Sequence, residues 1–400
     1  MGVARPAGAV GDDPEALAGL ALAAGRSAGL AAVGIATAEP FDDTRRVLEA
    51  RRRDGLSAGM AFTYRNPARS TDPARALPGA RSLVVGARSY RRTMAGAGSP
   101  ADGEVAGAAP VPAARPPDGP AGEVARYSWE DHYGPLRAAL EAVAGVLVAH
   151  GWRARVLVDD NGVVDRAAAH RAGLGWWGKN TNLLLPGRGS WFVLGSVVTD
   201  APLPPSGGPV GDGCGPCTRC LTGCPTGALV APGVLDARRC LAWLLEAPGA
   251  FPREHRVALG GRVYGCDDCQ EVCPPNRAAD RRVPPPPAGP GAEPTVDLLA
   301  LLALGDDALL ARFARWYVPR RDPAYLRRNA LVALGNVADG SDPRVRSALD
   351  AALAHAHPVV RAHAVWAARR LGLHDLVAAR TAGEADPQVL DEVGAPVPPR

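Results

Sequence analysis

The stretch CGPCTRCLTGCPTGAL, residues 214–229, decides how this chain folds and what it binds. Four cysteines follow one another at spacings of three, three and four, and Pro225 comes directly after the last of them, Cys224. This C-x2-C-x2-C-x3-C-P run is typical of 4Fe–4S sites, in which three thiolates bind one cluster and the fourth binds a second cluster. The stretch therefore predicts an iron–sulfur protein with two clusters.

A second, looser set of cysteines supports the two-cluster interpretation. Cys266, Cys269 and Cys273 repeat the C-x2-C-x3-C spacing before Pro274, and Cys240 precedes them by 26 residues. Because such sites exchange their fourth ligand, each cluster is expected to take one cysteine from the other run. The first predicted ligand set is Cys214, Cys217, Cys220 and Cys273, and the second is Cys224, Cys240, Cys266 and Cys269.

Two zinc sites are the alternative interpretation of the cysteines. Zinc ligands usually come as C-x2-C pairs, which explain neither the triple C-x2-C-x2-C nor the prolines after Cys224 and Cys273. A disulfide framework is typical of short secreted chains, whereas all eight cysteines lie in one window, 214–273, of a 400-residue chain. The clustering indicates metal binding, and the spacing favours 4Fe–4S clusters.

Composition and charge indicate more about the cellular location of the protein than about its binding partners. The formal net charge of +4 and a pI near 8.7 permit a polyanionic partner without requiring one. No N-terminal stretch combines a basic segment with an apolar one, as a secretory signal does, and no run of 18 apolar residues is present. We expect a cytoplasmic monomer that does not associate with membranes.

The chain divides into three expected domains, which make an α+β and α multidomain protein. Residues 1–205 alternate helical and strand patterns and predict an α/β domain, within which the Gly/Ala/Pro-rich residues 94–122 predict a disordered insertion. Residues 206–283 contain the cysteines and predict a ferredoxin-like domain, followed by a polyproline linker at 284–294. Residues 295–400 are helical, and matching apolar patterns at 328–335 and 363–370 predict HEAT-like repeats, with a plain helical bundle as the alternative.

The densest polar cluster outside the cysteines lies between residues 158 and 185. Asp159 ends a predicted strand, where α/β domains place catalytic groups. Asp165 opens a helix and is interpreted as its N-terminal cap. Lys179 is the only lysine among 45 basic residues, which indicates either chance or a position that needs a compact ammonium. Neither a dinucleotide-binding nor a P-loop motif is present.

The chain resembles the epoxyqueuosine reductase family, and four segments carry the resemblance. They are, in order, VDDNGVVDRAAAHRAGLGWWGKNTNLL (158–184), CGPCTRCLTGCPTGAL (214–229), LDARRCLAWL (235–244) and GGRVYGCDDCQEVCPPN (260–276). The stretches GLSAGMAFTYRNPARSTDPARALPGARSLVV (55–85) and ARYSWEDHYGPLR (125–137) are similar too. More distantly, the chain looks like the reductive dehalogenases, which share the plan of cobalamin plus two clusters.

The resemblance implies a substrate, two kinds of cofactor and a set of site residues. The family removes the epoxide oxygen of epoxyqueuosine at the wobble position of tRNA, which gives queuosine, and it uses cobalamin and two 4Fe–4S clusters. The family's proton donor falls on Asp159. The family's cobalamin contacts fall on Arg69, Ala125, Asp159, Leu183 and Leu194, although Arg69 lies one residue further from Pro73 than the family's arginine does.

A basic segment in the helical part predicts the contact with tRNA. Arginines bind phosphate, and aromatic side chains offer stacking surfaces for unpaired bases. Between residues 312 and 328 six arginines are interleaved with Trp316, Tyr317 and Tyr325, against one acid, Asp322, and the resemblance favours RNA binding by this segment. The six arginines are Arg312, Arg315, Arg320, Arg321, Arg327 and Arg328, of which Arg327 and Arg328 are the predicted contacts with nucleic acid.

Three other functions are alternative interpretations of the sequence. A cobalamin and iron–sulfur reductase of a small electrophile, as in reductive dehalogenases, needs no basic helical tail. An electron-carrier ferredoxin leaves the 158–185 cluster unexplained, and a zinc-bearing RNA-binding protein leaves the cysteine spacing unexplained. The expected partners of the reductase are a tRNA that carries epoxyqueuosine and an electron donor that the sequence does not identify.

Overall fold

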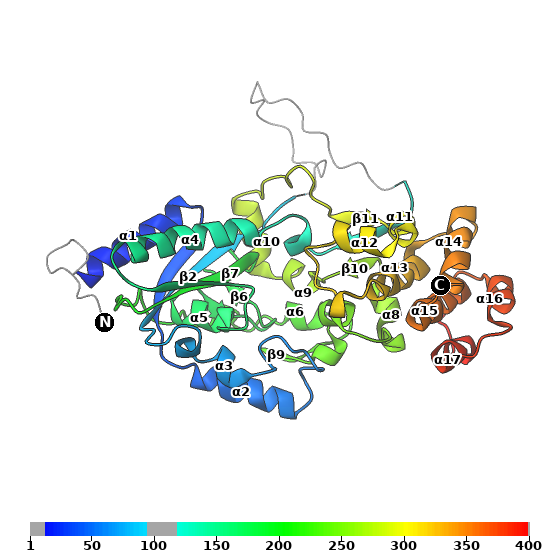
Figure 1. Cartoon of the computed structure of the whole chain (residues 1–400), viewed down its shortest axis with the longest axis horizontal. Helices are drawn as coiled ribbons and strands as arrows, with labels where there is room; N and C mark the ends of the chain where they lie inside the picture. The colour runs from blue at the N-terminus through cyan, green and yellow to red at the C-terminus, as the bar shows by residue number, and fades with distance from the viewer. Residues whose placement is uncertain (1–12, 94–117, 399–400) are drawn as a thin grey trace, which may run out of the picture. The chain divides into compact units, whose positions relative to one another are not determined.

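The computed structural model describes residues 13–93 and 118–398, which form two compact units (Figure 1). The first unit comprises Met1–Arg91, Asp131–Arg238 and Asp268–Pro285, and the second comprises Arg92–Glu130, Arg239–Asp267 and Pro286–Arg400. Each unit is therefore built from three separate stretches of chain. The predicted ferredoxin-like segment 206–283 contributes to both.

A four-stranded sheet forms the centre of the first unit. Its strands are β1 (Ala32–Thr37), β2 (Ser82–Ser89), β7 (Phe192–Thr199) and β4 (Ala154–Val158), in the order β1-β2-β7-β4. Every neighbouring pair is antiparallel. Sequence patterning indicates where strands lie but not how they pair, so the expected α/β domain is an antiparallel sheet with helices packed on it.

Helices cover both faces of this sheet. Helices α1 (Pro14–Ser27) and α4 (Tyr133–Ala149) contact each other and pack on one face, and α5 (Asp165–Arg171) packs on the other (Figure 1). Residues Gly195–Thr199 of the central strand are all buried, as expected for a strand covered on both sides. Helix α1 begins where the Asp13 carboxylate accepts a hydrogen bond from the Glu15 N–H, with Pro14 at its first position.

Shorter elements of the first unit, and the loops between them, contain six of the eight cysteines. Two hairpins, β5 (Trp176–Trp177) with β6 (Leu183–Leu184) and β8 (Leu229–Ala231) with β9 (Val234–Leu235), lie before and after the first cysteine run. The helices here are α2 (Asp42–Arg53), α3 (Pro67–Ser70), α6 (Arg219–Thr222), α9 (Asp268–Glu271) and α10 (Pro274–Arg282).

The second unit joins a small sheet to a set of helices. The sheet has the order β10 (Arg262–Tyr264), β3 (Ala121–Val124), β11 (Thr295–Asp297). The helices are α7 (Leu241–Glu246), α8 (Arg253–Leu259), α11 (Leu298–Ala303), α12 (Asp306–Arg312), α13 (Ala324–Val337), α14 (Pro343–Leu353), α15 (Pro358–Arg370), α16 (His374–Thr381) and α17 (Pro387–Gly394). Helix α15 contacts both α13 and α17, while α14 contacts α16, so alternate helices stack on each other.

Two sequence boundaries need correction. The predicted insertion 94–122 ends too late, because residues 121–124 form β3 in the middle of the small sheet; residues 94–117 lie outside the described part of the chain. The predicted linker 284–294 is part of the second unit from Pro286 onward: Ala292 is buried, and the Glu293 N–H donates to the Trp129 carbonyl oxygen at 2.9 Å. Within residues 13–93 and 118–398 no helix is long and apolar enough to cross a membrane.

Candidate iron–sulfur centre and substrate site

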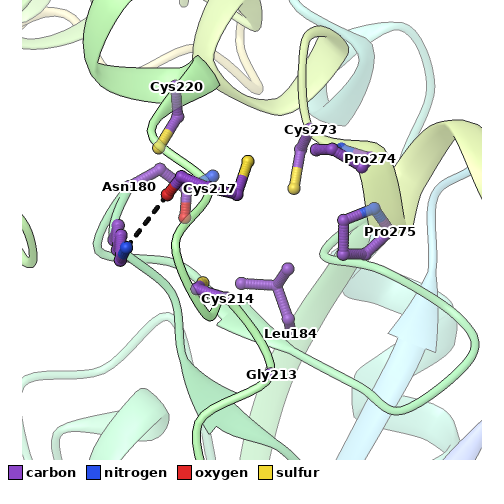
Figure 2. Close-up of a pocket in the computed structure, with 10 residues that line it drawn as sticks. Asn180, Leu184, Gly213, Cys214, Cys217, Cys220, Cys273, Pro274 and Pro275 are labelled. Carbon is purple, nitrogen blue, oxygen red and sulfur yellow. Dashed lines mark hydrogen bonds between the residues drawn. The ribbon is translucent and has the colours of Figure 1, made fainter.

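The four cysteines of the first predicted ligand set line one cavity of about 140 Å³. Cys214, Cys217 and Cys220 come from the first run, and Cys273 precedes α10. Figure 2 shows Cys217, Cys220 and Cys273 around one open space, with Leu184 and Pro275 beside it. The structure thus brings together thiols that lie more than fifty residues apart in the sequence, in the combination that the spacing predicts.

The pKa of Cys273 reflects its closeness to the other three thiols. Burial, with a smaller contribution from the neighbouring thiols of Cys214, Cys220 and Cys217, raises the pKa of Cys273 to about 11, against a hydrogen bond from the Asn276 backbone that lowers it. A thiol in this setting stays protonated unless cationic charge enters the cavity. Metal coordination supplies such charge and deprotonates thiols outright.

The cavity fits an iron–sulfur cluster better than a zinc ion. Zinc needs four ligands, with each sulfur about 2.3 Å from one centre. A cubane instead offers four separate iron corners, each of which takes one cysteine, and four thiols spread around a cavity match that arrangement.

The second ligand set remains a prediction. Cys224 and Cys269 belong to the first unit, and Cys240 and Cys266 belong to the second. Burial acts to raise the pKa of the Cys224 thiol, but hydrogen bonds from the Thr226 backbone, the Thr226 hydroxyl and the backbone at Ala228 together lower it. The Ala228 N–H lies 3.2 Å from the Cys224 sulfur. This thiol is therefore prepared to ionise, as a metal ligand must be.

A turn between β5 and β6 contacts both cysteine runs. The Lys179 Nζ donates to the carbonyl oxygens of Gly215 at 2.5 Å and Cys217 at 3.0 Å. The next residue, Asn180, is buried and donates from Nδ2 to the Cys269 carbonyl oxygen at 3.3 Å. The sequence indicated Lys179 as a candidate site residue but not Asn180. The only indication for Asn180 was its position directly after Lys179.

A buried polar network holds the second run in place. The Asn276 Nδ2 donates to the Gln270 carbonyl oxygen at 2.8 Å and to the Ser190 hydroxyl at 3.0 Å. The Ser190 hydroxyl donates in turn to Gln270 Oε1 at 2.9 Å. Gln270 directly follows Cys269, and Asn276 lies three residues after Cys273. No sequence pattern indicated these residues, because isolated Ser, Asn and Gln residues are common on surfaces.

Asp159 lies directly after β4 in an uncommon backbone conformation. Its φ of 51° is in the left-handed region, which few residues other than glycine adopt. Its side chain is exposed, yet loss of hydration from surrounding protein raises its pKa, the charge of Asp160 raises it further, and Arg137 lowers it. The loop is held by Asn161, whose Oδ1 accepts a hydrogen bond from the Thr63 N–H at 2.8 Å.

Asp165 does not have the capping role that the sequence suggested. Val164 occupies the N-cap position of α5, no side chain caps the helix there, and Asp165 is the first helical residue. Burial raises the pKa of Asp165 well above its usual value, and Asp159 adds to the effect. A second carboxyl group therefore belongs to the environment of Asp159.

The predicted cobalamin contacts fall in both units. Arg69, Asp159, Leu183 and Leu194 lie in the first unit, and Ala125 lies in the second, where it is buried. Val158 of β4 pairs with Gly195 of β7, so Asp159 and Leu194 are the next positions along this antiparallel pair. Leu183 and Leu194 belong to one apolar cluster, in which Leu194 keeps part of its surface exposed.

The two arginines predicted to contact tRNA prove to be largely internal. Arg328 has 0% of its surface exposed and donates to the carbonyl oxygens of Leu244, Leu245, Ala247 and Gly249. It satisfies carbonyl groups at the C-terminal end of α7, so the prediction that it contacts phosphate is wrong. Arg327 is 6% exposed and pairs with Asp306 at 2.7 Å, and its contact with tRNA stays a prediction.

The remaining members of the same basic segment are partly buried and partly exposed. Trp316 and Tyr325 are buried, and Trp316 stacks on Tyr264 with ring centroids 4.4 Å apart. Tyr317 is 56% exposed. The exposed arginines of the segment are Arg312, Arg315, Arg320 and Arg321.

Comparison with known proteins identifies the cysteine region first. Residues 213–276 match a family described as a 4Fe-4S double cluster binding domain, and this range contains all eight cysteines. Together with the cavity of four thiols, this match supports binding of 4Fe–4S clusters by the chain.

Relatives and solved structures match the chain over nearly its whole length. The chain is 31% identical over 379 residues to an epoxyqueuosine reductase of Bacillus cereus, with 93% of this chain and 94% of the relative covered. It is 33% identical to that of Bacillus subtilis, with 87% and 86% covered. A crystal structure of an epoxyqueuosine reductase with an epoxyqueuosine-modified tRNA-Tyr stem loop matches with a TM-score of 0.80 and 30% identity, covering 93% of this chain and 96% of that one. The structure of the Streptococcus thermophilus enzyme matches with a TM-score of 0.78 and 26% identity, with the same coverage. The family resemblance in the motifs is thereby confirmed, and the chain belongs to the epoxyqueuosine reductase family of oxidoreductases.

Proposed function

We propose that this protein reduces epoxyqueuosine to queuosine in tRNA, with electrons supplied through two 4Fe–4S clusters and bound cobalamin. The observation that carries the proposal is the full-length match to epoxyqueuosine reductases, one of them solved with an epoxyqueuosine-modified stem loop, combined with the cavity of four cysteines. Reduction of a small electrophile is not favoured, because these whole-length relatives are tRNA-modifying reductases.

The reaction requires a proton donor as well as electrons. Removing an epoxide oxygen as water, with a double bond left behind, consumes two electrons and two protons. Asp159 suits the delivery of a proton to the departing oxygen, because its raised pKa keeps a larger share of the carboxyl protonated than an ordinary aspartate. The left-handed backbone at Asp159 is an outlier of the kind that concentrates at active sites, which supports the same role.

The residues around Asp159 fit a corrin ring. Asp159 directly follows Val158, which pairs with Gly195 next to Leu194 in β7, and Leu183 shares an apolar cluster with Leu194. A flat, largely apolar ring needs such a surface, and a carboxyl group beside it would be further deprived of water. In the proposal Arg69, Ala125, Asp159, Leu183 and Leu194 hold cobalamin. When bound in its reduced form, cobalamin would act as a strong electron donor for cleavage of the strained C–O bond of the epoxide.

Recognition of the tRNA is assigned to the helical part of the chain. The stacking of alternate helices from α13 to α17 supports the HEAT-like description. Arg320 and Arg321 are exposed and follow the exposed ring of Tyr317, so phosphate contacts and base stacking are available from one short segment. This segment replaces Arg328 as the proposed site of contact.

The proposal is tested by analysing the nucleosides of treated tRNA. The full chain, reconstituted with iron and sulfide, is incubated anaerobically with a strong reductant, cobalamin and epoxyqueuosine-containing tRNA, and the digest is examined by mass spectrometry. We expect the mass of the modified nucleoside to fall by the mass of one oxygen atom. If no queuosine forms although both clusters and cobalamin are bound, the assignment of the cofactors stands and the assignment of epoxyqueuosine as the substrate is contradicted.

A further inference from the structure

The single lysine of the chain belongs to the lining of the predicted iron–sulfur cavity. Lys179 lines this cavity together with Cys214, Cys217, Cys220 and Cys273. Its ammonium donates to two carbonyl oxygens of the first cysteine run, those of Gly215 and Cys217, at 2.5 and 3.0 Å. The other basic residues of the chain, 44 of 45, are arginines, so a general need for positive charge does not explain a lysine here.

The main chain around Lys179 is fixed by its own contacts. The Lys179 carbonyl oxygen accepts a hydrogen bond from the Gly233 N–H at 2.9 Å, and the Gly233 carbonyl oxygen accepts one from Arg51 at 2.6 Å. Before it, Gly178 allows a close approach, because a Cβ there would lie 2.2 Å from Leu184 Cδ1. The ammonium is therefore presented from a constrained turn.

The same turn reaches the second cysteine run through the neighbouring side chain. Asn180 donates to the Cys269 carbonyl oxygen, while Lys179 holds Gly215 and Cys217. Two consecutive side chains thus tie together two loops that supply thiols to one cavity. A compact ammonium with three rotatable donors can satisfy two carbonyl groups of a tight loop, which a planar guanidinium fits less well.

We propose that Lys179 is a positioning residue for the cluster bound by Cys214, Cys217, Cys220 and Cys273, and that its positive charge raises the reduction potential of that cluster. A cluster with four thiolate ligands is negatively charged, and reduction adds another negative charge. A fixed ammonium beside it stabilises the reduced form more than the oxidised form, and net charge and hydrogen bonding are recognised determinants of cluster potential. The inference depends on the cluster but not on the tRNA substrate or on cobalamin.

The test compares variants of the reconstituted full chain without tRNA or cobalamin. Iron content is measured first, and the midpoint potentials of the clusters are then obtained by redox titration followed by electron paramagnetic resonance. In Lys179→Met we expect one of the two clusters to titrate at a more negative potential while the other is unchanged. Lys179→Arg retains the charge and should lie closer to the wild type than the Met variant does.

A matched control removes a charge from the same segment without touching the loop carbonyls. Arg219 is exposed next to Cys220, so Arg219→Met should shift the potential less than Lys179→Met, because solvent screens an exposed charge. Equal potentials in Lys179→Met and the wild type, at equal iron content, would overturn the electrostatic claim. If iron is lost in Lys179→Met and not restored in Lys179→Gln, which can still donate hydrogen bonds, the charge is needed for cluster retention, and this outcome also supports the role of the ammonium.

Discussion

Asp160 raises the pKa of the neighbouring Asp159, in addition to the larger effect of lost hydration. Two adjacent carboxylates are costly to ionise together, so the first keeps its proton to a higher pH. The residue that is proposed to donate a proton is therefore adjusted by a charge that can be removed without touching it.

This relationship predicts the pH dependence of the reaction. If Asp159 must be protonated, the rate falls as the pH rises through its pKa, and that fall lies above the pH expected for an ordinary aspartate. Asp160→Asn removes a charge that raises this pKa, so the fall should move to lower pH. Arg137→Met removes a charge that lowers it, so the fall should move to higher pH. Single-turnover rates across the pH range measure both shifts, and shifts in the same direction would contradict the assignment.

Replacing Asp159 itself separates chemistry from binding. Asp159→Asn retains the shape of the side chain but cannot donate a proton of the same acidity. We expect queuosine formation to fall by about 10²-fold or more, within the range of general acid catalysis. Iron content and cobalamin absorption should match the wild type. An Asn variant that reacts at the full rate would remove Asp159 from the proton transfer.

Removing a ligand thiol tests the first cluster. Cys217 lines the cavity, so Cys217→Ala leaves three of its four cysteines and should lower the iron bound per chain after reconstitution. The neighbouring Thr218→Ala provides a matched control in the same loop and should bind iron normally. Full iron content in Cys217→Ala, measured together with the visible absorption of the cluster, would exclude Cys217 as a ligand.

Arg328 should matter for stability. Arg328→Met leaves the carbonyl groups of Leu244, Leu245, Ala247 and Gly249 without their donor in a buried site. Leaving a buried hydrogen-bonding group without its partner typically costs about 1–3 kcal/mol. We expect the free energy of unfolding of the second unit, followed by chemical denaturation, to fall by this order. Arg320→Met, at an exposed position, should leave it within about 0.5 kcal/mol of the wild type.

Arg320 should matter for tRNA affinity instead. A phosphate contact contributes to binding through release of counterions, so losing one reduces the salt dependence of the affinity. Arg320→Met should bind epoxyqueuosine-containing tRNA more weakly than the wild type, and the slope of log affinity against log salt should be smaller. An unchanged affinity and slope would exclude this residue from the contact.

The sequence predicted the iron–sulfur centre better than the surfaces of the helical part. Spacing alone grouped Cys273 with Cys214, Cys217 and Cys220, because cluster geometry constrains ligand order along the chain, and these four side chains line one cavity. No comparable rule of spacing determines whether an arginine side chain is exposed or buried. Helix α13 is buried on nearly all sides, and Arg328 serves carbonyl groups at the end of α7, which no local pattern reveals. Likewise, the strands were recognisable from their apolar runs, but their antiparallel pairing depends on contacts between distant segments.

The most direct test of the account is whether this chain forms queuosine only when cobalamin is present. Reconstituted protein with full iron content is incubated anaerobically with a strong reductant and epoxyqueuosine-containing tRNA, in parallel with and without cobalamin, and the nucleosides are quantified by mass spectrometry. We predict queuosine in the first reaction and unchanged epoxyqueuosine in the second. Equal amounts of queuosine in both would contradict the cobalamin-dependent mechanism, and none in either would contradict the assignment of the substrate.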